Sequence, residues 1–287
     1  MIQSMTAFAR RDAHHDHTTL VWEIRSVNHR YLELTPRLPD AFRELEGPLR
    51  ERCRVHLNRG KVEIGLRYQQ QSASNQLHID TALVAQLGDA LDQIGAVLGP
   101  TAAINPADIL RYPGVLQTPE QDFSSLVPAA LALLDATLAE LVEQRAREGA
   151  VLAQLLEDRL VGVTEQVART RAALPRIQEA LRQRLQRRVE EVVAQPDQDR
   201  LEQELVLLAQ KMDVAEELDR LEAHVAEVRR TLKQGGHVGR RLDFLMQELN
   251  REANTLASKS IDTDTTQAAV ELKVLIEQMR EQVQNIE

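Results

Sequence analysis

The sequence predicts an α+β protein in which a small strand-rich N-terminal unit is followed by a long, mainly α-helical body. Residues 1–70 contain segments rich in β-branched and aromatic residues, and KVEIGLRY alternates apolar and polar positions. After the polar break QQQSASN, Leu, Val and Ala recur at three- and four-residue steps. We therefore expect an N-terminal α+β unit over residues 1–72, a helical middle region with an extended arm or hairpin over 73–198, and a C-terminal helical domain over 199–287.

In the N-terminal unit, strands are expected at VWEIRSV, YLELTPRLP and KVEIGLRY. One helix of about Pro39 to Leu57 is expected between them, because Pro39-Asp40 suits a helix start and Asn58-Arg59-Gly60 supplies a stop. The run His14 to His17 has donors for a transition metal, but as a short polar run between strands it predicts a hairpin loop.

The helical body is predicted in five segments. The first spans Leu83 to Leu98 and leads into a Pro- and Gly-containing loop, and the second runs from about Ser125 to Val193 with an interruption at Pro175. The other three are Asp199 to Lys233, Gly239 to Ser258, and Thr265 to the end.

Composition limits the class of protein. The 43% apolar and 28% charged residues are typical of a folded soluble chain. The opening lacks an apolar signal core, and the longest apolar stretch, Leu126 to Leu134, is too short to span a bilayer, so we expect a cytoplasmic protein with no membrane partner. The lone Cys53 excludes an internal disulfide and any multi-cysteine metal site, and it fits a reducing compartment.

The formal net charge of −9 argues against a protein that coats nucleic acid by bulk attraction. The charge is unevenly distributed, however. Residues 1–70 contain 12 Lys and Arg against 9 Asp and Glu, so this part is the better candidate for a surface that faces a polyanion.

Two predicted helices carry carboxylates at helical spacing. In QKMDVAEELDRLEAH, the side chains of Asp213, Glu217, Arg220 and His224 lie along one stripe, which suits divalent-metal binding or proton exchange. The alternative is a set of ordinary acid–Arg pairs along a helix surface, and spacing alone favours that alternative.

The next helix, GRRLDFLMQELNREANTLASK, has an apolar stripe with two polar flanks. One flank is unusually rich in amides, although amides are only middling helix formers, and amides and Arg hydrogen-bond well to RNA. The other flank carries Glu248 and Glu252 one turn apart. The apolar stripe consists of Leu242, Leu245, Leu249, Ala253 and Leu256.

Two groups of Arg and amide side chains are the predicted RNA contacts. The first lies on and beside a strand that ends at a turn, and the second lies at the start and along one flank of the amide-rich helix. The residues are Arg25, Asn28, His29 and Arg30 in the first group, and Arg240, Arg241, Arg251 and Asn254 in the second.

Other catalytic patterns are absent from the sequence. It contains no Walker A motif, no GxGxxG, no GxSxG and no HExxH. Nucleotide hydrolases, dinucleotide enzymes, serine hydrolases and zincins therefore lose support.

Several segments together resemble the YicC/YloC family of stress-associated bacterial endoribonucleases. They are MIQSMTAFAR, EIRSVNHRYLEL followed by RLP, RAREG, QELVLLAQKMDVAEELDRLEAH, GRRLDFLMQELNREANTLASKSID and ELKVLIEQMREQVQNIE. The departures, Ala7 and Ala9 in the opening and Ala223 before His224, remove no titratable group. The resemblance implies single-strand RNA cleavage helped by a divalent metal inside a ring-like homo-oligomer, a hexamer, but it does not assign catalytic roles.

We expect the carboxylates of the two helices to meet in one Mg²⁺ or Mn²⁺ site, because a short Gly-Gly connection allows an antiparallel hairpin. The predicted ligands are Asp213, Glu217, His224, Glu248 and Glu252. His224, Glu248 and Glu252 are the candidate catalytic residues, with an unligated His224 as general acid or base. Two alternatives stay open. Glu248 and Glu252 pair with Arg251, with Lys259 or with neighbouring subunits, or the protein is a non-catalytic RNA-binding adaptor that delivers transcripts to another nuclease.

Overall fold

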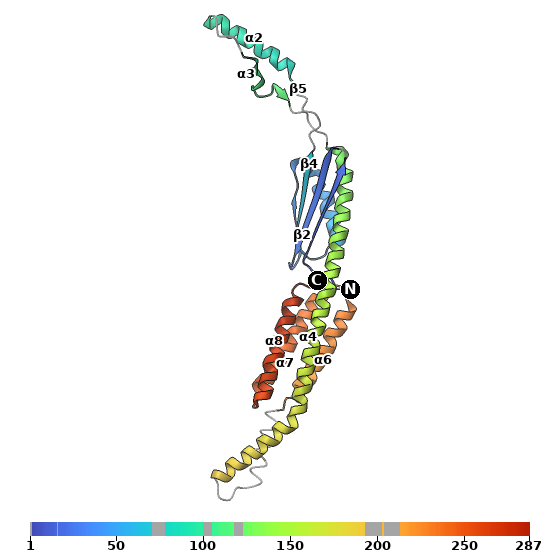
Figure 1. Cartoon of the computed structure of the whole chain (residues 1–287), viewed down its shortest axis with the longest axis vertical. Coiled ribbons are helices and arrows are strands. Elements are labelled where there is room, and N and C mark those ends of the chain that lie inside the picture. Colours follow the sequence, from blue (N-terminus) through green and yellow to red (C-terminus); the bar gives the residue numbers. More distant parts are fainter. Residues whose placement is uncertain are drawn as a thin grey trace.

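The computed structural model describes residues 2–15, 17–70, 78–99, 105–117, 123–192, 203 and 213–287. A β-sheet unit and a helical bundle lie end to end along one long helix, α4 (Val127–Val192) (Figure 1). The predicted α+β class, with strands first and helices after them, is confirmed.

The sheet has four strands in the order β1-β2-β4-β3. They are β1 (Ala7–His15), β2 (Thr18–Val27), β3 (Leu32–Arg37) and β4 (Gly60–Gln70). β1 with β2 and β2 with β4 are antiparallel, whereas β3 and β4 are parallel. A parallel pair needs a crossover, and the 3₁₀ helix η1 (Asp40–Leu45) with α1 (Glu46–His56) provides it. The predicted helix of about Pro39 to Leu57 is therefore confirmed, with a 3₁₀ first part.

One face of the sheet forms a core with α1 and the first third of α4. Leu20, Trp22 and Ile24 alternate along β2 and are fully buried, and the indole N–H of Trp22 donates to Ala130 O at 2.8 Å. α4 supplies the facing apolar side chains at helical spacing, namely Leu126, just before its first residue, Ala130, Leu134, Leu138 and Leu141.

α4 then continues into the second core without a break, so the predicted interruption at Pro175 is wrong. A proline removes one intrahelical hydrogen bond, but the good helix formers on both sides of Pro175 keep the helix continuous. Within the described residues, α4 is also the one helix that is long and apolar enough, by length and composition alone, to cross a membrane. Its apolar residues from Leu126 to Leu141 belong to the core of the sheet unit.

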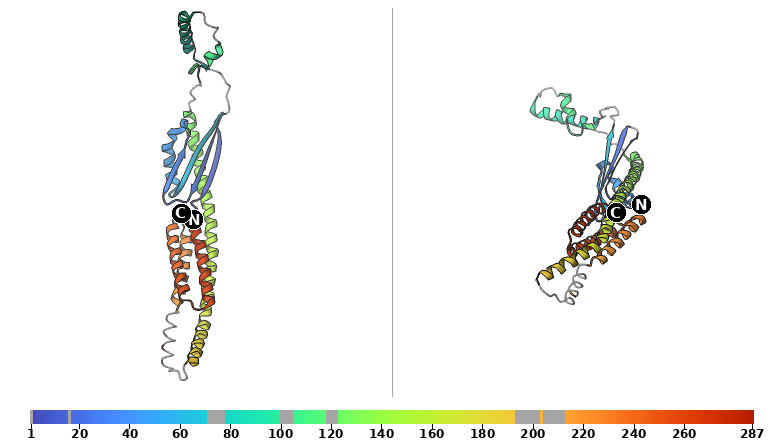
Figure 2. Two further views of the ribbon diagram at one scale, coloured as in Figure 1. Left: turned by 90° about the vertical axis from the view of Figure 1, so that its left-hand side faces the viewer. Right: turned by 60° about the horizontal axis from the view of Figure 1, so that its bottom comes forward.

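In the helical bundle, the later part of α4 packs against two helices, α6 (Ala215–Gln234) and α8 (Thr263–Val283). A third helix, α7 (Gly239–Lys259), packs against both of these (Figure 2). The predicted apolar stripe of α7 is buried along its whole length. Of the predicted helix Asp199 to Lys233, residues 199–212, apart from position 203, lie outside the described residues.

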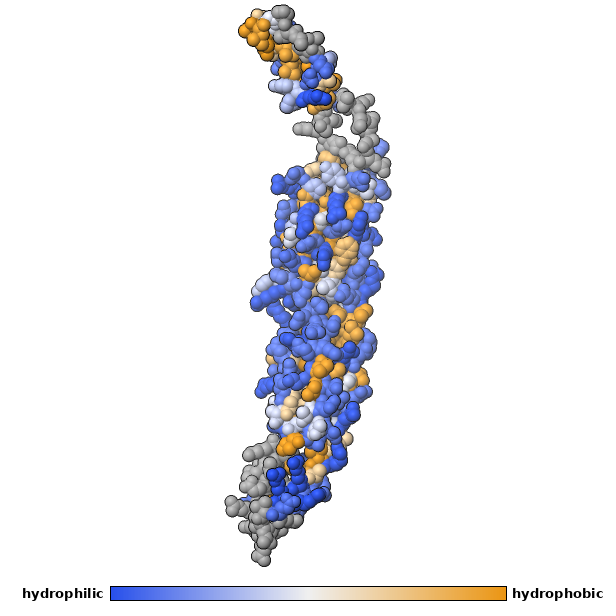
Figure 3. Space-filling view, turned by 60° about the vertical axis from the view of Figure 1, so that its left-hand side comes forward, coloured by the Kyte–Doolittle hydropathy of each residue, from blue (hydrophilic) through white to orange (hydrophobic). Residues whose placement is uncertain are grey.

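A third, smaller unit follows β4. It contains β5 (His78–Ile79), α2 (Thr81–Leu98), α3 (Pro106–Leu110), and β6 (Leu116–Gln117), which pairs with β5. α2 confirms the predicted helix Leu83 to Leu98, yet none of its residues is fully buried. Val97 and Leu98 are 84% and 75% exposed, and apolar side chains gather on this unit in Figure 3.

The first and last segments of the chain meet where the sheet unit joins the bundle. Ser4 bridges to Ile286, and Glu287 N donates to Gln3 O at 3.0 Å. Gly149 of α4 lies directly against the backbone of Ile2, where a Cβ would collide. Both chain ends are therefore fixed to α4 at the boundary between the two cores.

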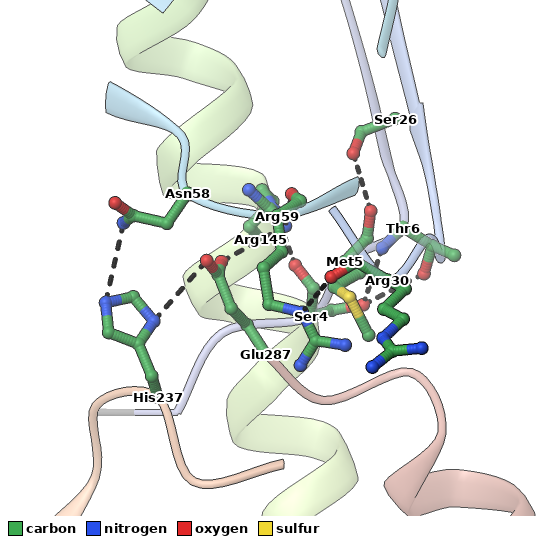
Figure 4. A network of polar contacts seen from close by, with 10 residues as sticks. All are labelled: Ser4, Met5, Thr6, Ser26, Arg30, Asn58, Arg59, Arg145, His237 and Glu287. Carbon is green, nitrogen blue, oxygen red and sulfur yellow. Dashed lines mark hydrogen bonds and ion pairs between the residues drawn. The ribbon is translucent and has the colours of Figure 1, made fainter. Parts of the chain in front are cut away.

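A buried ion pair lies at this joint (Figure 4). Arg145 of α4 is fully buried; its Nε donates to Ser4 O at 2.5 Å and one Nη donates to Arg59 O at 3.2 Å. The same Nη lies 3.2 Å from a carboxylate oxygen of Glu287, and His237 lies 3.4 Å from the other oxygen. Burial lowers the pKa of Arg145, while Glu287 acts in the opposite direction. One side chain thus links α4, the chain ends and the loop before β4.

Candidate metal site and RNA-contact surfaces

The candidate site is built on the antiparallel pair α6–α7. Gly235 and Gly236 have φ values of 65° and 80°, which other residues rarely adopt, and they reverse the chain between the helices. Leu221 and Val225 of α6 pack in the same core as the apolar stripe of α7. The polar flanks of both helices are therefore brought beside each other at the edge of the core.

Three of the predicted ligands converge there. His224 of α6 lies opposite Glu248 and Glu252 of α7, and one ligand atom from each lies within 4.8 Å of the others. Glu252 is 3% exposed, and His224 and Glu248 are half-buried. Within the described residues, none of the three side chains makes a hydrogen bond. Carboxylates this close repel each other unless a cation lies between them, so the donor set fits a divalent metal.

Two arginines lie beside the carboxylates of this group but form no hydrogen bond with them. Arg220 Nη1 lies 3.6 Å from Glu252 Oε1, and Arg251 Nη1 lies 3.7 Å from Glu248 Oε2. Both distances are longer than a hydrogen bond. The arginines therefore balance charge but leave the carboxylate oxygens available as ligands.

The other two predicted ligands face a lysine instead. Lys259 Nζ lies 2.7 Å from Glu217 Oε1 and donates to Asp213 O at 2.9 Å. The Asp213 carboxylate accepts from the backbone N–H of Ala215, the first residue of α6, at 2.9 Å. Lys259 follows Glu252 by seven residues, about 10 Å along the helix. Asp213 and Glu217 thus form a second cluster, in which an ammonium group supplies the positive charge.

The sheet residues predicted to contact RNA lie at the end of the sheet nearest the bundle. Arg25 and Asn28 are exposed and make no side-chain hydrogen bond or ion pair with the described part of the chain. His29 Nδ1 lies 3.1 Å from Tyr31 O, to which it donates in the tautomer that carries the Nδ1 proton. Its Nε2 lies 3.7 Å from Glu33 Oε2. The Arg30 guanidinium lies 5.3 Å from the centre of the Tyr31 ring.

The α7 residues predicted to contact RNA divide into two sets. Arg240 and Arg241 lie at the start of α7, where Arg240 is exposed and Arg241 pairs with Glu227. Hydrogen bonds from Arg230 and from Arg241 lower the pKa of Glu227. Arg251 and Asn254 lie further along, and Asn254 donates to Asn250 at 3.0 Å.

Reasoning from sequence missed Arg145 and the exposed aromatic Phe8. Both arginines of the RAREG motif look alike in the sequence. In the structure Arg145 is fully buried and Arg147 is exposed. The apolar residues around Arg145 at helical spacing were the available signal. Cys53 is buried as expected, and burial raises its thiol pKa to about 12, so it offers no thiolate nucleophile near neutral pH.

Sequence models of two regions match this chain. The model described as "Endoribonuclease YicC-like, N-terminal region" matches residues 2–154, and "Endoribonuclease YicC-like, C-terminal" matches residues 170–287. The chain belongs to the YicC-like endoribonuclease family. The family expected from the sequence motifs is thereby confirmed.

Two curated relatives match over the full length of both chains. A protein of Haemophilus influenzae is 49% identical over 288 residues, and one of Clostridioides difficile is 30% identical over 293 residues. Each is named a probable endoribonuclease YicC. In this YicC-like chain, all five predicted metal ligands lie in the C-terminal matched region, and Arg25 to Arg30 lie in the N-terminal one.

Proposed function

We propose that this YicC-like protein cleaves RNA internally at a divalent-metal site held by His224, Glu248 and Glu252. The observation that carries the proposal is the convergence of three ligand atoms within 4.8 Å, on side chains that make no hydrogen bond within the described chain. The family description and the names of both relatives supply the reaction class. Carboxylate and imidazole donors together suit Mn²⁺, and Mg²⁺ is the second candidate.

A bound divalent cation supplies a Lewis acid for the phosphate and lowers the pKa of its water ligand. The chain's own groups have separate roles. Glu248 and Glu252 hold the negative charge that attracts the cation, and Arg220 and Arg251 limit their mutual repulsion. His224 completes the ligand set, or it exchanges a proton with the reacting oxygen when it is not a ligand.

The proposed substrate is single-stranded RNA. Arg25, Asn28, His29 and Arg30 on the sheet unit and Arg240 at the joint provide hydrogen-bond donors for phosphates and sugars. Arg251 and Asn254 lie on α7 beside Glu248 and Glu252, where they can position the strand for cleavage.

We further propose a homo-oligomeric ring, a hexamer, in the cytoplasm. The exposed apolar side chains of α2, Ile94, Val97 and Leu98, support self-association because monomers seldom expose such groups together. A lone buried thiol suits a reducing compartment. Light scattering at micromolar concentration tests the assembly, and a monomer mass contradicts it.

The catalytic proposal is tested with end-labelled single-stranded RNA, with Mn²⁺ or Mg²⁺ and then with EDTA. Three variants each remove one proposed ligand and introduce no side chain larger than the original by more than a small amount. They are Glu248→Gln, Glu252→Gln and His224→Ala. We expect each to lower the cleavage rate by about two orders of magnitude or more, with RNA affinity retained. Glu271→Gln, an exposed carboxylate of α8, is the matched control and should cleave at the normal rate.

The adaptor alternative makes a different prediction. A non-catalytic protein binds RNA but yields no cleavage with any metal, and the ligand variants then behave like wild type. Wild-type rates in all three ligand variants of an active enzyme would instead remove the α6–α7 site and leave the reaction class intact.

A further inference from the structure

The second face of the β-sheet is open. Ala9, Trp22 and Ile24 point into the core, so their sequence neighbours point to the opposite face. The left view of Figure 2 shows α4 passing behind the strands, on the core side. Phe8 and Val27 lie on the open face, and neither belongs to either hydrophobic core of the described chain.

Charges on this open face differ between its two ends. Towards the β1–β2 hairpin, two cations are ion-paired with one carboxylate: Arg10 and Arg67 lie 3.4 and 3.3 Å from Glu23. At the end nearest the bundle, Arg25 and Lys61 make no ion pair or side-chain hydrogen bond with the described residues. Arg25 lies opposite Glu63 in the register, but that carboxylate pairs with Arg37 at 3.3 Å instead.

The unpaired cations surround exposed apolar side chains. Phe8 is 52% exposed and is the direct cross-strand partner of Arg25. Val27, 36% exposed, lies two residues further along the same face and opposite Lys61. Cross-strand partners lie roughly 5 Å apart and diagonal neighbours about 7–8 Å apart, so these four side chains form one continuous surface. We call Phe8, Arg25, Val27 and Lys61 the platform.

An exposed aromatic ring beside unpaired cations is chemically suited to a nucleotide. The ring offers a stacking partner for a flat base, and guanidinium and ammonium groups offer partners for the adjacent phosphates. An apolar protein partner would leave both cations without counter-charges, and burying unpaired charge is costly. The charge pattern therefore favours a polyanion that also carries planar rings.

We propose that the platform binds an unpaired nucleobase of RNA by stacking on Phe8, with Arg25 and Lys61 contacting the flanking phosphates. The inference rests on the proposed function and deepens it, because it names the element that selects single strands. A base inside a duplex is already stacked and paired, and its face cannot reach Phe8. Selection for unpaired bases thus takes place on the sheet unit, away from the candidate metal site on α6–α7.

A direct test uses Phe8→Trp in the full-length chain. Stacking of a base quenches indole fluorescence, whereas Trp22 is fully buried and serves as an internal reference. We expect a single-stranded oligouridylate or oligoadenylate to quench the new indole. A duplex of the same length and an abasic oligonucleotide should leave the signal unchanged.

Affinity provides the second readout. With EDTA present to prevent cleavage, Phe8→Ala should weaken binding of the single strand by roughly 5- to 150-fold and leave binding of the abasic strand unchanged. Phe8→Trp should retain affinity. Tyr112→Ala is the matched control, since Tyr112 is 51% exposed in the unit after β4 and should bind RNA normally.

The outcomes separate this inference from the proposed function. The platform is overturned, but the nuclease is not, if three results are found together. Wild type cleaves RNA, RNA does not quench the indole of Phe8→Trp, and Phe8→Ala binds RNA with unchanged affinity. A change of oligomer mass in Phe8→Ala without a change in RNA affinity also overturns it, because the face would then be a protein interface. Base-dependent quenching in a protein that never cleaves RNA supports the platform and refutes the nuclease.

Discussion

Replacing the buried Arg145 should destabilise the protein more than any exposed substitution on α4. In Arg145→Met the chain keeps an unbranched side chain of similar length, so packing is largely preserved. What disappears is the positive charge beside Glu287, which is 2% exposed, and the two donors that satisfy Ser4 O and Arg59 O. Among the residues that the structure describes, the carboxylate is then left with His237 as its charged neighbour, at 3.4 Å.

The size of the effect follows from the burial of both partners. Charged hydrogen bonds contribute about 1.5–3 kcal/mol each, but they are not additive within one side chain. Removing one partner of a buried ion pair costs about 3–5 kcal/mol, because the remaining charge is uncompensated. We expect a loss of that size in the free energy of unfolding, a large share of the roughly 5–15 kcal/mol typical of folded proteins.

Urea unfolding followed by circular dichroism measures the loss, and Arg147→Met is the matched control. Arg147 is also on α4, but it is exposed and pairs with Glu143 at 3.0 Å, so its replacement should change stability by under about 1 kcal/mol. The double variant Arg145→Met/Glu287→Gln should recover part of the lost free energy of unfolding, because the uncompensated carboxylate charge of Glu287 is then absent. Equal losses for the two methionine variants would refute the reasoning.

Four further outcomes are expected. Trp22→Phe should lower the free energy of unfolding by about 1–3 kcal/mol in urea titrations, since Ala130 O loses its donor in a buried site. Burial raises the pKa of the Cys53 thiol to about 12, so this thiol stays protonated in the folded protein while it ionises in the unfolded one. The free energy of unfolding should therefore fall as pH rises from about 9 toward 12. At pH 8, iodoacetamide should label Cys53 only in unfolded protein. Arg25→Ala should reduce the slope of log affinity against log salt by about 1 in RNA-binding titrations, and an unchanged slope would remove this contact. Mn²⁺ should raise the melting temperature of wild type but not of Glu252→Gln, and equal shifts would place the ion elsewhere.

Much of the helical body could be predicted because its signals are local. The apolar stripe of α7 and the i, i+4 spacing of Glu248 and Glu252 follow directly from helical periodicity. The Gly-Gly connection correctly indicated an antiparallel α6–α7 pair, since glycine readily takes the positive φ that the reversal needs. The predicted interruption at Pro175 was wrong because one proline in a run of good helix formers does not end a helix.

The partners within the candidate site could not be predicted from spacing. Helical offsets placed Asp213, Glu217 and His224 on one stripe, but which of them face Glu252 depends on how far α6 and α7 slide and rotate against each other. In the structure, Lys259 reaches Glu217, and His224 is the α6 residue opposite the α7 carboxylates.

Residues close together in the chain were enough to predict that strands precede helices, the core stripe of α7 and the family. β1 was not among the three expected strands. Three features could be seen only in the folded chain: β4 lies between β2 and β3, α4 is shared by two cores, and Arg145 meets Glu287 across 142 positions of sequence. The folded chain also shows which sheet cations are ion-paired and which, among the described residues, stay unpaired beside Phe8. Such pairings form between residues brought together by packing and strand register, and no local pattern in the sequence encodes them.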